Sequence, residues 1–263
     1  MAFVNYATKN VAIKVVYYGP GLSGKTTNLR YIYFKLDPTS RGEFICLETA
    51  TERTFFFDLL PVKAGQVNDF KIHFQLMTVP GQVFYEASRK SVVKGADGIV
   101  FIADSQVALL DANIESFDYL RQNCLEHNMD LNDIPMVFQY NKRDLNNLIP
   151  IETFNNLLNP HRAPFVEASA INGVGVFETL KEISNMTVPY VKKKIFETKE
   201  GEEEKEKIEL SSIEPKEEKK EEQKVEFVDT PSSIQLRKIR IKDQGDIDKE
   251  ILNLMKEFTS KKT

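Results

Sequence analysis

One stretch near the N-terminus constrains this chain more than any other: Gly19 to Thr26 reads G-P-G-L-S-G-K-T. It fits the pattern G-x-x-x-x-G-K-[ST], in which backbone N–H groups of a glycine-rich turn surround phosphate oxygens at the start of a helix. The flanking residues agree with this pattern. An apolar, β-branched run, Val11 to Tyr18, comes before it, and Thr27 to Leu36 places apolar residues at helical spacing. The stretch therefore predicts a strand–loop–helix unit that binds the phosphates of a nucleotide.

Each residue of this loop has an expected role. The Lys25 ammonium is expected to reach the β- and γ-phosphates, and the Thr26 hydroxyl is expected to bind Mg²⁺. The remaining residues expected to contact the nucleotide here are Gly19, Gly21, Leu22, Ser23, Gly24 and Thr27. The loop by itself is compatible with either ATP or GTP.

Composition excludes several classes of protein. A net charge of −4 and a pI near 5.6 argue against a nucleic-acid-binding protein, which needs a basic face. No run approaches the roughly 18 apolar residues of a membrane span, so we expect no integral membrane segment. The two cysteines, Cys46 and Cys124, form no metal or disulfide framework. These features favour a cytoplasmic protein, in which any attachment to a membrane comes through partners or the C-terminal segment.

The order of apolar patterns predicts an α/β domain over residues 1–195, with a parallel-rich sheet covered by helices. Residues 48–61 show no clear period. Besides the two elements around the loop, strands are expected at 42–47, 70–78, 98–104, 134–140 and 163–168, and helices at 84–94, 109–126, 151–158 and 176–194.

The composition changes after that domain. Of the 28 residues 197–224, 12 are Glu and 7 are Lys, so this stretch cannot bury enough apolar surface to order itself. We therefore expect a charged, disordered linker at 196–232. Residues 233–263 are expected to hold a short strand, at 234–241, and an amphipathic helix, at 246–258. That helix either docks back on the domain or binds a groove of a partner.

A second motif selects the base. Asn141 to Asp144 reads N-K-R-D and follows a buried strand, at the sheet edge where ligands gather. The Asp144 carboxylate can accept hydrogen bonds from the N1–H and the N2 amino group of guanine, which adenine lacks. Asn141 is expected to brace the loop and the stem of Lys142 to cover the base. Ser169 and Ala170, just past the last strand, are expected to offer a backbone N–H to the guanine oxygen.

With both motifs in place, the chain resembles a Ras-type small GTPase and, more narrowly, the MglA family of bacterial Ras-like GTPases, which are gliding-motility and cell-polarity switches. The likeness rests on four stretches, 17–22, 53–58, 78–85 and 139–145, and covers residues 1 to about 195. It implies a P-loop NTPase of the Ras-like small GTPase fold, with a mostly parallel central sheet flanked by helices. The C-terminal extension lies outside it.

The resemblance also implies roles for two switch segments. Thr54 is expected to contact Mg²⁺ and the γ-phosphate, and Gly81 to sense that phosphate through its N–H. Gln82 is expected to orient the attacking water, and Arg53 to act in cis as an arginine finger. The catalytic residues implied are thus Gln82 and Arg53.

One position departs from the usual Ras pattern. Thr78 stands where the D-x-x-G aspartate would hold Mg²⁺ through water. We therefore expect Mg²⁺ to depend more on Thr26, Thr54 and the phosphates, and intrinsic hydrolysis to be slow. Asp104 is expected to cap the following helix rather than to replace that aspartate.

The function implied is a molecular switch that hydrolyses GTP to GDP and phosphate and controls cell polarity or motility through effectors. The family precedent adds a roadblock-type homodimeric activating protein that repositions Arg53 and Gln82. A non-hydrolysing GTP-binding interaction module that works through its tail is the alternative. Asp144 disfavours a third possibility, an ATP-using enzyme.

Overall fold

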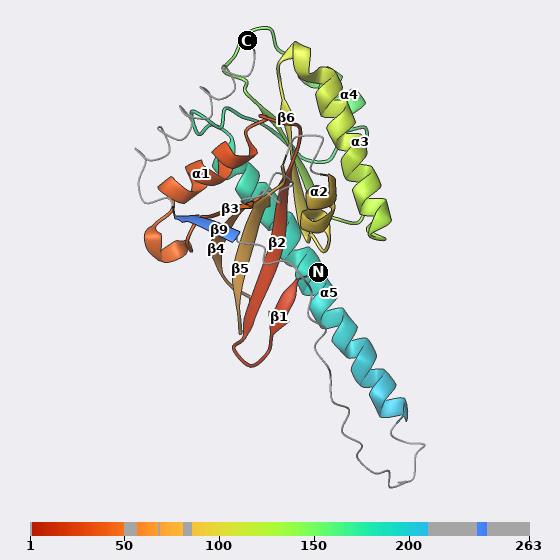
Figure 1. The fold of residues 1–263 in the computed structure, drawn as a ribbon. Coiled ribbons are helices and arrows are strands. Elements are labelled where there is room, and N and C mark those ends of the chain that lie inside the picture. The colour runs from red at the N-terminus through yellow and green to blue at the C-terminus, as the bar shows by residue number, and fades with distance from the viewer. Residues whose placement is uncertain (1, 50–56, 68, 81–85, 210–235, 241–263) are drawn as a thin grey trace.

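A computed structural model describes residues 2–49, 57–67, 69–80, 86–209 and 236–240 (Figure 1). The helices are α1 (Lys25–Lys35), α2 (Glu86–Val93), α3 (Leu110–Glu126), α4 (Ile151–Leu157) and α5 (Val176–Glu209), with short 3-10 turns at Pro38–Ser40 and Val107–Leu109. The strands are β1 (Phe3–Asn5), β2 (Asn10–Tyr18), β3 (Ile45–Thr49), β4 (Phe57–Val67), β5 (Phe70–Thr78), β6 (Gly98–Asp104), β7 (Met136–Asn141), β8 (Phe165–Glu167) and β9 (Leu236–Arg240).

The nine strands among the described residues form one sheet in the order β8-β7-β6-β2-β5-β4-β3-β9, with β1 paired to β2 beside this row. The pairings from β8 through β5 are all parallel. Strands β4, β3 and β9 continue the sheet by antiparallel pairing. The carboxyl ends of β2, β6 and β7 therefore meet at one edge, where the loops that follow them can form a site.

Helices cover both faces of the sheet. Successive side chains of β2 point to opposite faces, and buried apolar residues occur on both. Ile13, Val15 and Tyr17 belong to a core under α1 and α5, whereas Val16 and Tyr18 belong to a second core under α2, α3 and α4. Figure 1 shows α1 and α5 on the face opposite to α2 and α3. These two cores confirm the expected α/β architecture with a sheet between helical layers.

A buried polar network connects α1, which follows the phosphate loop, to β7, which precedes Asn141. The side-chain amides of Asn28, on α1, and Gln139, on β7, exchange two hydrogen bonds of 2.8 and 2.9 Å. Gln139 also donates to the Thr179 hydroxyl of α5 at 2.8 Å. All three residues are fully buried, so the helix after the phosphate loop is fixed relative to the strand before Asn141.

Strand β1 was not predicted, and two further elements differ from the sequence prediction. Strand β4 begins among residues that showed no clear period, because its buried row reads Asp58, Leu60 and Val62, so that a carboxylate interrupts the apolar alternation. Helix α5 continues to Glu209, well past the expected end near Lys194. Glu and Lys are good helix formers and pair along a helix surface, so a charged segment can extend a helix that a core has already nucleated.

The C-terminal extension is described at β9, which falls within the expected strand at 234–241 and pairs with β3. The amphipathic helix expected at 246–258 lies outside the described residues. The division into a domain at 1–195, a linker at 196–232 and a segment at 233–263 stays a prediction. No helix within the described part of the chain is long and apolar enough to cross a membrane.

Candidate nucleotide-binding site

The phosphate loop connects β2 to α1, and two of its glycines are required by space as well as by backbone angle. Gly24 precedes α1 with φ of +102°, and a Cβ there would lie 2.2 Å from Asn141 Nδ2. A Cβ on Gly19, with φ of +147°, would lie 2.2 Å from the Ile102 carbonyl oxygen. Both positions therefore exclude a side chain. The loop can approach β6 and β7 closely only because these residues are glycines.

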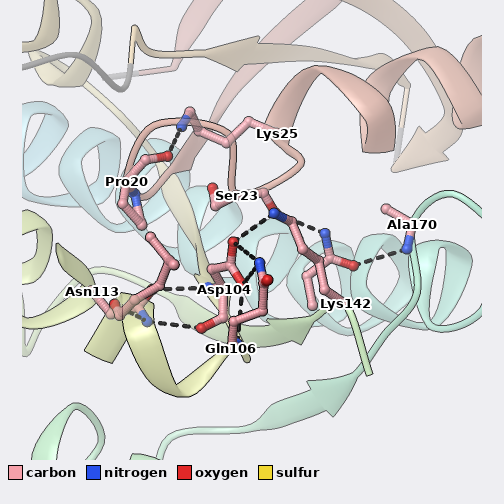
Figure 2. A network of polar contacts seen from close by, with 10 residues as sticks. Pro20, Ser23, Lys25, Asp104, Gln106, Asn113, Lys142 and Ala170 are labelled. Carbon is pink, nitrogen blue, oxygen red and sulfur yellow. Dashed lines mark hydrogen bonds and ion pairs between the residues drawn. The ribbon is translucent and has the colours of Figure 1, made fainter. Parts of the chain in front are cut away.

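Lys25 is buried at the start of α1, with 6% of its surface exposed. Its ammonium donates to the carbonyl oxygens of Gly19 at 2.9 Å and Pro20 at 2.6 Å, so the side chain folds over the loop (Figure 2). Burial lowers the pKa of Lys25 to about 7, and the negative charge of Asp58 only partly opposes this effect. Burial makes the charged form of Lys25 unfavourable, and an anionic ligand such as a phosphate would stabilise it.

Asn141, at the end of β7, joins three loops through its side-chain amide. Its Nδ2 donates to the Ser23 carbonyl of the phosphate loop at 2.7 Å, and its Oδ1 accepts the Ala170 N–H at 2.8 Å. The residue is buried, and both ends of its amide are satisfied within the protein. The expected bracing role of Asn141 is what this geometry provides.

The loop after Asn141 is held by charge and backbone contacts. The Lys142 ammonium pairs with Asp104 Oδ2 at 2.6 Å (Figure 2), and the Arg143 N–H donates to the Ala168 carbonyl at 2.9 Å. Lys142 adopts a left-handed backbone, with φ of +67°. Asp144 is exposed, so its carboxylate is accessible to a ligand. These contacts fix the backbone from which Asp144 projects.

Asp104 differs from expectation, and the backbone of the Ser169–Ala170 turn has partners within the protein. The Asp104 carboxylate accepts the Gln106 N–H at 3.1 Å and binds Lys142, but it does not cap α3, which begins at Leu110. At the other turn, the Ala170 N–H donates to Asn141 and the Ser169 N–H donates to Val174 O at 3.0 Å. Both amides are thus paired within the protein, because the turn closes on itself to hold Asn141. An Ala170 contact to a base would be shared with Asn141 Oδ1.

A buried carboxylate that sequence reasoning missed lies beside the expected metal ligand. Asp58 of β4 accepts hydrogen bonds at Oδ2 from the hydroxyl of Thr26 at 2.6 Å and from that of Thr78 at 3.0 Å. The Asp58 N–H also donates to the Thr78 hydroxyl at 2.9 Å. The signal was available in the sequence: an acid between Phe57 and Leu59, in an apolar run, is seldom buried without a polar partner.

The other expected site residues are placed as follows. Gly21, Leu22 and Thr27 are on the outer side of the phosphate loop and α1, with Leu22 and Thr27 exposed, while Ser23 is fully buried. The expected switch residues Arg53, Thr54, Gly81 and Gln82 lie outside the described residues. Within the described ranges, no cluster of three or more His, Cys, Asp or Glu side chains could hold a metal ion. A cation here would therefore depend on hydroxyls, on Asp58 and on ligand phosphates.

Comparison with known proteins identifies the family. A model of the Ras family matches residues 14–188. The mutual gliding-motility protein MglA of Myxococcus xanthus (strain DK1622) is 51% identical over 193 residues, which cover 73% of this chain and 99% of that relative. The residues that the family model matches include the phosphate loop, Thr26, Asp58 and Thr78, and Asn141. The chain belongs to the Ras family of small GTPases, in its MglA branch.

Proposed function

We propose that this GTPase switches between a GTP form that binds effectors and a GDP form that does not, and that it serves gliding motility or cell polarity. The process is suggested by the relative, a gliding-motility protein. The observation that carries the nucleotide assignment is the Asn141 side chain, which joins the phosphate loop to the loop bearing Asp144. The protein would work in the cytoplasm, recruited to a cell pole or the inner membrane face by partners.

Guanine recognition is assigned to Asn141, Lys142 and Asp144, with Ser169 and Ala170 beside them. Asp144 is exposed, whereas the backbone before it is held by the Arg143 N–H bond to the Ala168 carbonyl and the backbone after it by the Leu145 N–H bond to the Lys142 carbonyl. A fixed backbone with an accessible carboxylate selects a base by hydrogen bonding at little further ordering cost. Lys142 is assigned to cover the base with its stem, and its ion pair with Asp104 supports this role by fixing the end of the side chain.

Asp144→Asn should weaken GTP binding and favour xanthine nucleotides. The amide can donate to the second ring oxygen of xanthine, and it no longer accepts from the guanine donors as a charged group. Losing a hydrogen bond to a charged group costs about 1.5–3 kcal/mol, so GTP affinity should fall roughly 10- to 100-fold. Competition binding with GTP and XTP measures the change, with the exposed Asp111→Asn as a charge-matched control. An unaltered preference for GTP in Asp144→Asn would remove this residue from base recognition.

Phosphate binding is assigned to Gly19, Gly21, Leu22, Ser23, Gly24, Lys25, Thr26 and Thr27, and it predicts proton uptake. A phosphate beside Lys25 opposes the burial that lowers the pKa of this ammonium to about 7, and so raises that pKa. At pH 8.5 the lysine is mostly neutral before binding and charged after it. GDP binding should therefore take up close to one proton, and affinity should fall as pH rises above 7.

Titration calorimetry in two buffers of different ionisation enthalpy measures this uptake. The same protein at pH 6 is the control, because Lys25 is already protonated there and its contribution disappears. Equal heats in the two buffers at pH 8.5 would show that Lys25 does not gain a proton from phosphate binding.

The residues present fit a Mg²⁺ ion, which when bound would neutralise phosphate charge. We assign Thr26 and Thr54 as its protein ligands, and add Asp58 as the carboxylate that orients Thr26. Asp58 compensates for Thr78, because it brings a negative charge to the same cluster from the neighbouring strand. The Mg²⁺ site would therefore have a carboxylate close to its ligands, although Thr78 itself carries no charge.

Asp58→Asn should raise the Mg²⁺ concentration needed to retain GDP. Outer-shell partners of metal ligands are typically worth about 10- to 100-fold in metal affinity, and the substitution removes the charge while keeping the shape. Release of a fluorescent GDP analogue across a Mg²⁺ series gives the measurement. Asp97→Asn is the matched control, because Asp97 is also buried but accepts from the Lys14 N–H, on another part of the sheet. The same Mg²⁺ dependence in both variants would reject the assignment.

Turnover is assigned to Gln82 and Arg53, with Gly81 sensing the γ-phosphate, and a roadblock-type homodimeric protein is proposed as the activator. Arg53 precedes Thr54 directly, so a segment that brings Thr54 to the γ-phosphate also brings a guanidinium near it. A charged group so placed stabilises the charge that develops on the transferring phosphoryl group.

Gln82→Leu and Arg53→Ala should each bind GTP normally and lose stimulated hydrolysis, by about 10³-fold for the arginine. Single-turnover hydrolysis with and without the activating protein provides the test. Arg53→Lys keeps the charge but loses the planar fork, and it should recover only part of the rate. Stimulated rates at the wild-type level in Arg53→Ala would exclude the finger role.

A further inference from the structure

The outer edge of strand β3 is covered by the chain's own C-terminal extension. Strand β9 pairs with β3 antiparallel over five consecutive residues, from Ile45 opposite Arg240 to Thr49 opposite Leu236. Figure 1 shows β9 beside β3 at the margin of the sheet, beyond β4. Without β9, β3 would end the sheet with a row of unpaired N–H and C=O groups, which is a template for any extended peptide.

Strand β9 lies outside the part of the chain that matches the family. The Ras-family match ends at residue 188, and the 73% of this chain that aligns with MglA from Myxococcus xanthus already covers 99% of that relative. The five residues of β9 include three cations, and the register places Arg237 opposite Glu48.

The connection is long enough for β9 to come from the same molecule. Helix α5 ends at Glu209, and 26 residues, 210–235, separate it from Leu236. An extended chain of that length spans about 90 Å at most, so it places little restriction on where β9 can pair. A tethered segment acts at a high effective concentration, typically of the order of millimolar.

Strand β3 lies directly before the segment that contains Arg53 and Thr54, so its pairing bears on that segment. Residues 50–56, which contain Arg53 and Thr54, connect β3 directly to β4. Cys46 of β3 is paired with Asp58 of β4 on one side and with Ile239 of β9 on the other. The tail strand, the strand before the switch segment and the carboxylate beside Thr26 therefore lie in one row of the sheet.

We propose that the β3 edge is a binding surface for an extended peptide strand, and that β9 is a built-in competitor that fills it. A protein partner that adds a strand to this edge must first displace residues 236–240. This inference goes beyond the proposed function, because it concerns a peptide partner of the sheet edge and not the nucleotide or its hydrolysis.

A disulfide tests the pairing in the full-length protein. Directly opposed residues of an antiparallel pair have Cα atoms about 4.5–5.5 Å apart, within the range that a disulfide bridges. Ile239→Cys should therefore cross-link to the natural Cys46 on mild oxidation. Lys238→Cys is the matched control, because one step along a strand turns the residue to the other face. The double variant Cys46→Ser/Ile239→Cys excludes Cys124, which is buried.

The expected result is a monomeric species of altered electrophoretic mobility, formed about tenfold or more faster than in either control because the two cysteines are held together. Equal cross-linking in all variants would overturn the β3–β9 pairing. A dimeric cross-linked species would overturn the intramolecular assignment, because β9 would then come from a second copy. Retained GDP in each variant confirms that it is folded.

A peptide probe tests the competition. A labelled peptide of residues 234–242 is added to the wild type, to the disulfide-locked protein and to the full-length variant Lys238→Pro/Ile239→Pro. One of two consecutive N–H groups faces the neighbouring strand, so the two prolines remove at least one hydrogen bond from β9 to β3. The proline variant should bind the peptide about tenfold or more tightly than the wild type, and the locked protein least of all. Equal affinity in the three proteins, or binding to none, would overturn the proposal.

Discussion

The arrangement depends on one buried amide. Asn141 reaches from the end of β7 to Ser23 with its nitrogen and to Ala170 with its oxygen, so a single side chain holds the phosphate loop against the loops of the base site. Gly24 is a glycine for the same reason, since a Cβ there would occupy the space of Asn141 Nδ2. Below it, Gln139 and Asn28 repeat the connection one layer deeper. Phosphate and base recognition are thereby fixed at a constant separation, as a ligand with both groups requires.

The Thr26–Asp58–Thr78 cluster shows how a site keeps its charge when a motif residue changes. A threonine at position 78 removes a carboxylate from the end of β5, yet β4 supplies one from the adjacent position of the sheet. The Thr78 hydroxyl then both donates to and accepts from Asp58, so the two side chains act as a unit. A carboxylate therefore lies beside Thr26 although position 78 is a threonine.

Much of the fold and site follows from local patterns, and the exceptions have a common physical origin. The phosphate loop and Asn141 were predicted because each lies at the end of a strongly apolar strand, where parallel topology sets the position of the next loop. Asp58 was missed because its partners, Thr26 and Thr78, are 32 and 20 residues away, and a pattern along one strand does not reveal them. Asp104 was expected to cap a helix because the neighbouring strand end, with Lys142, is likewise distant in the sequence.

The edge strand β3 connects these observations. It pairs with β4, which carries Asp58, and with β9, which belongs to the extension, while residues 50–56 run between β3 and β4. A strand can change register only by steps that turn every side chain to the other face or move each by two positions. Pairing on both sides of β3 must then break together, so β9 adds five paired residues to the resistance of β3 against any such step.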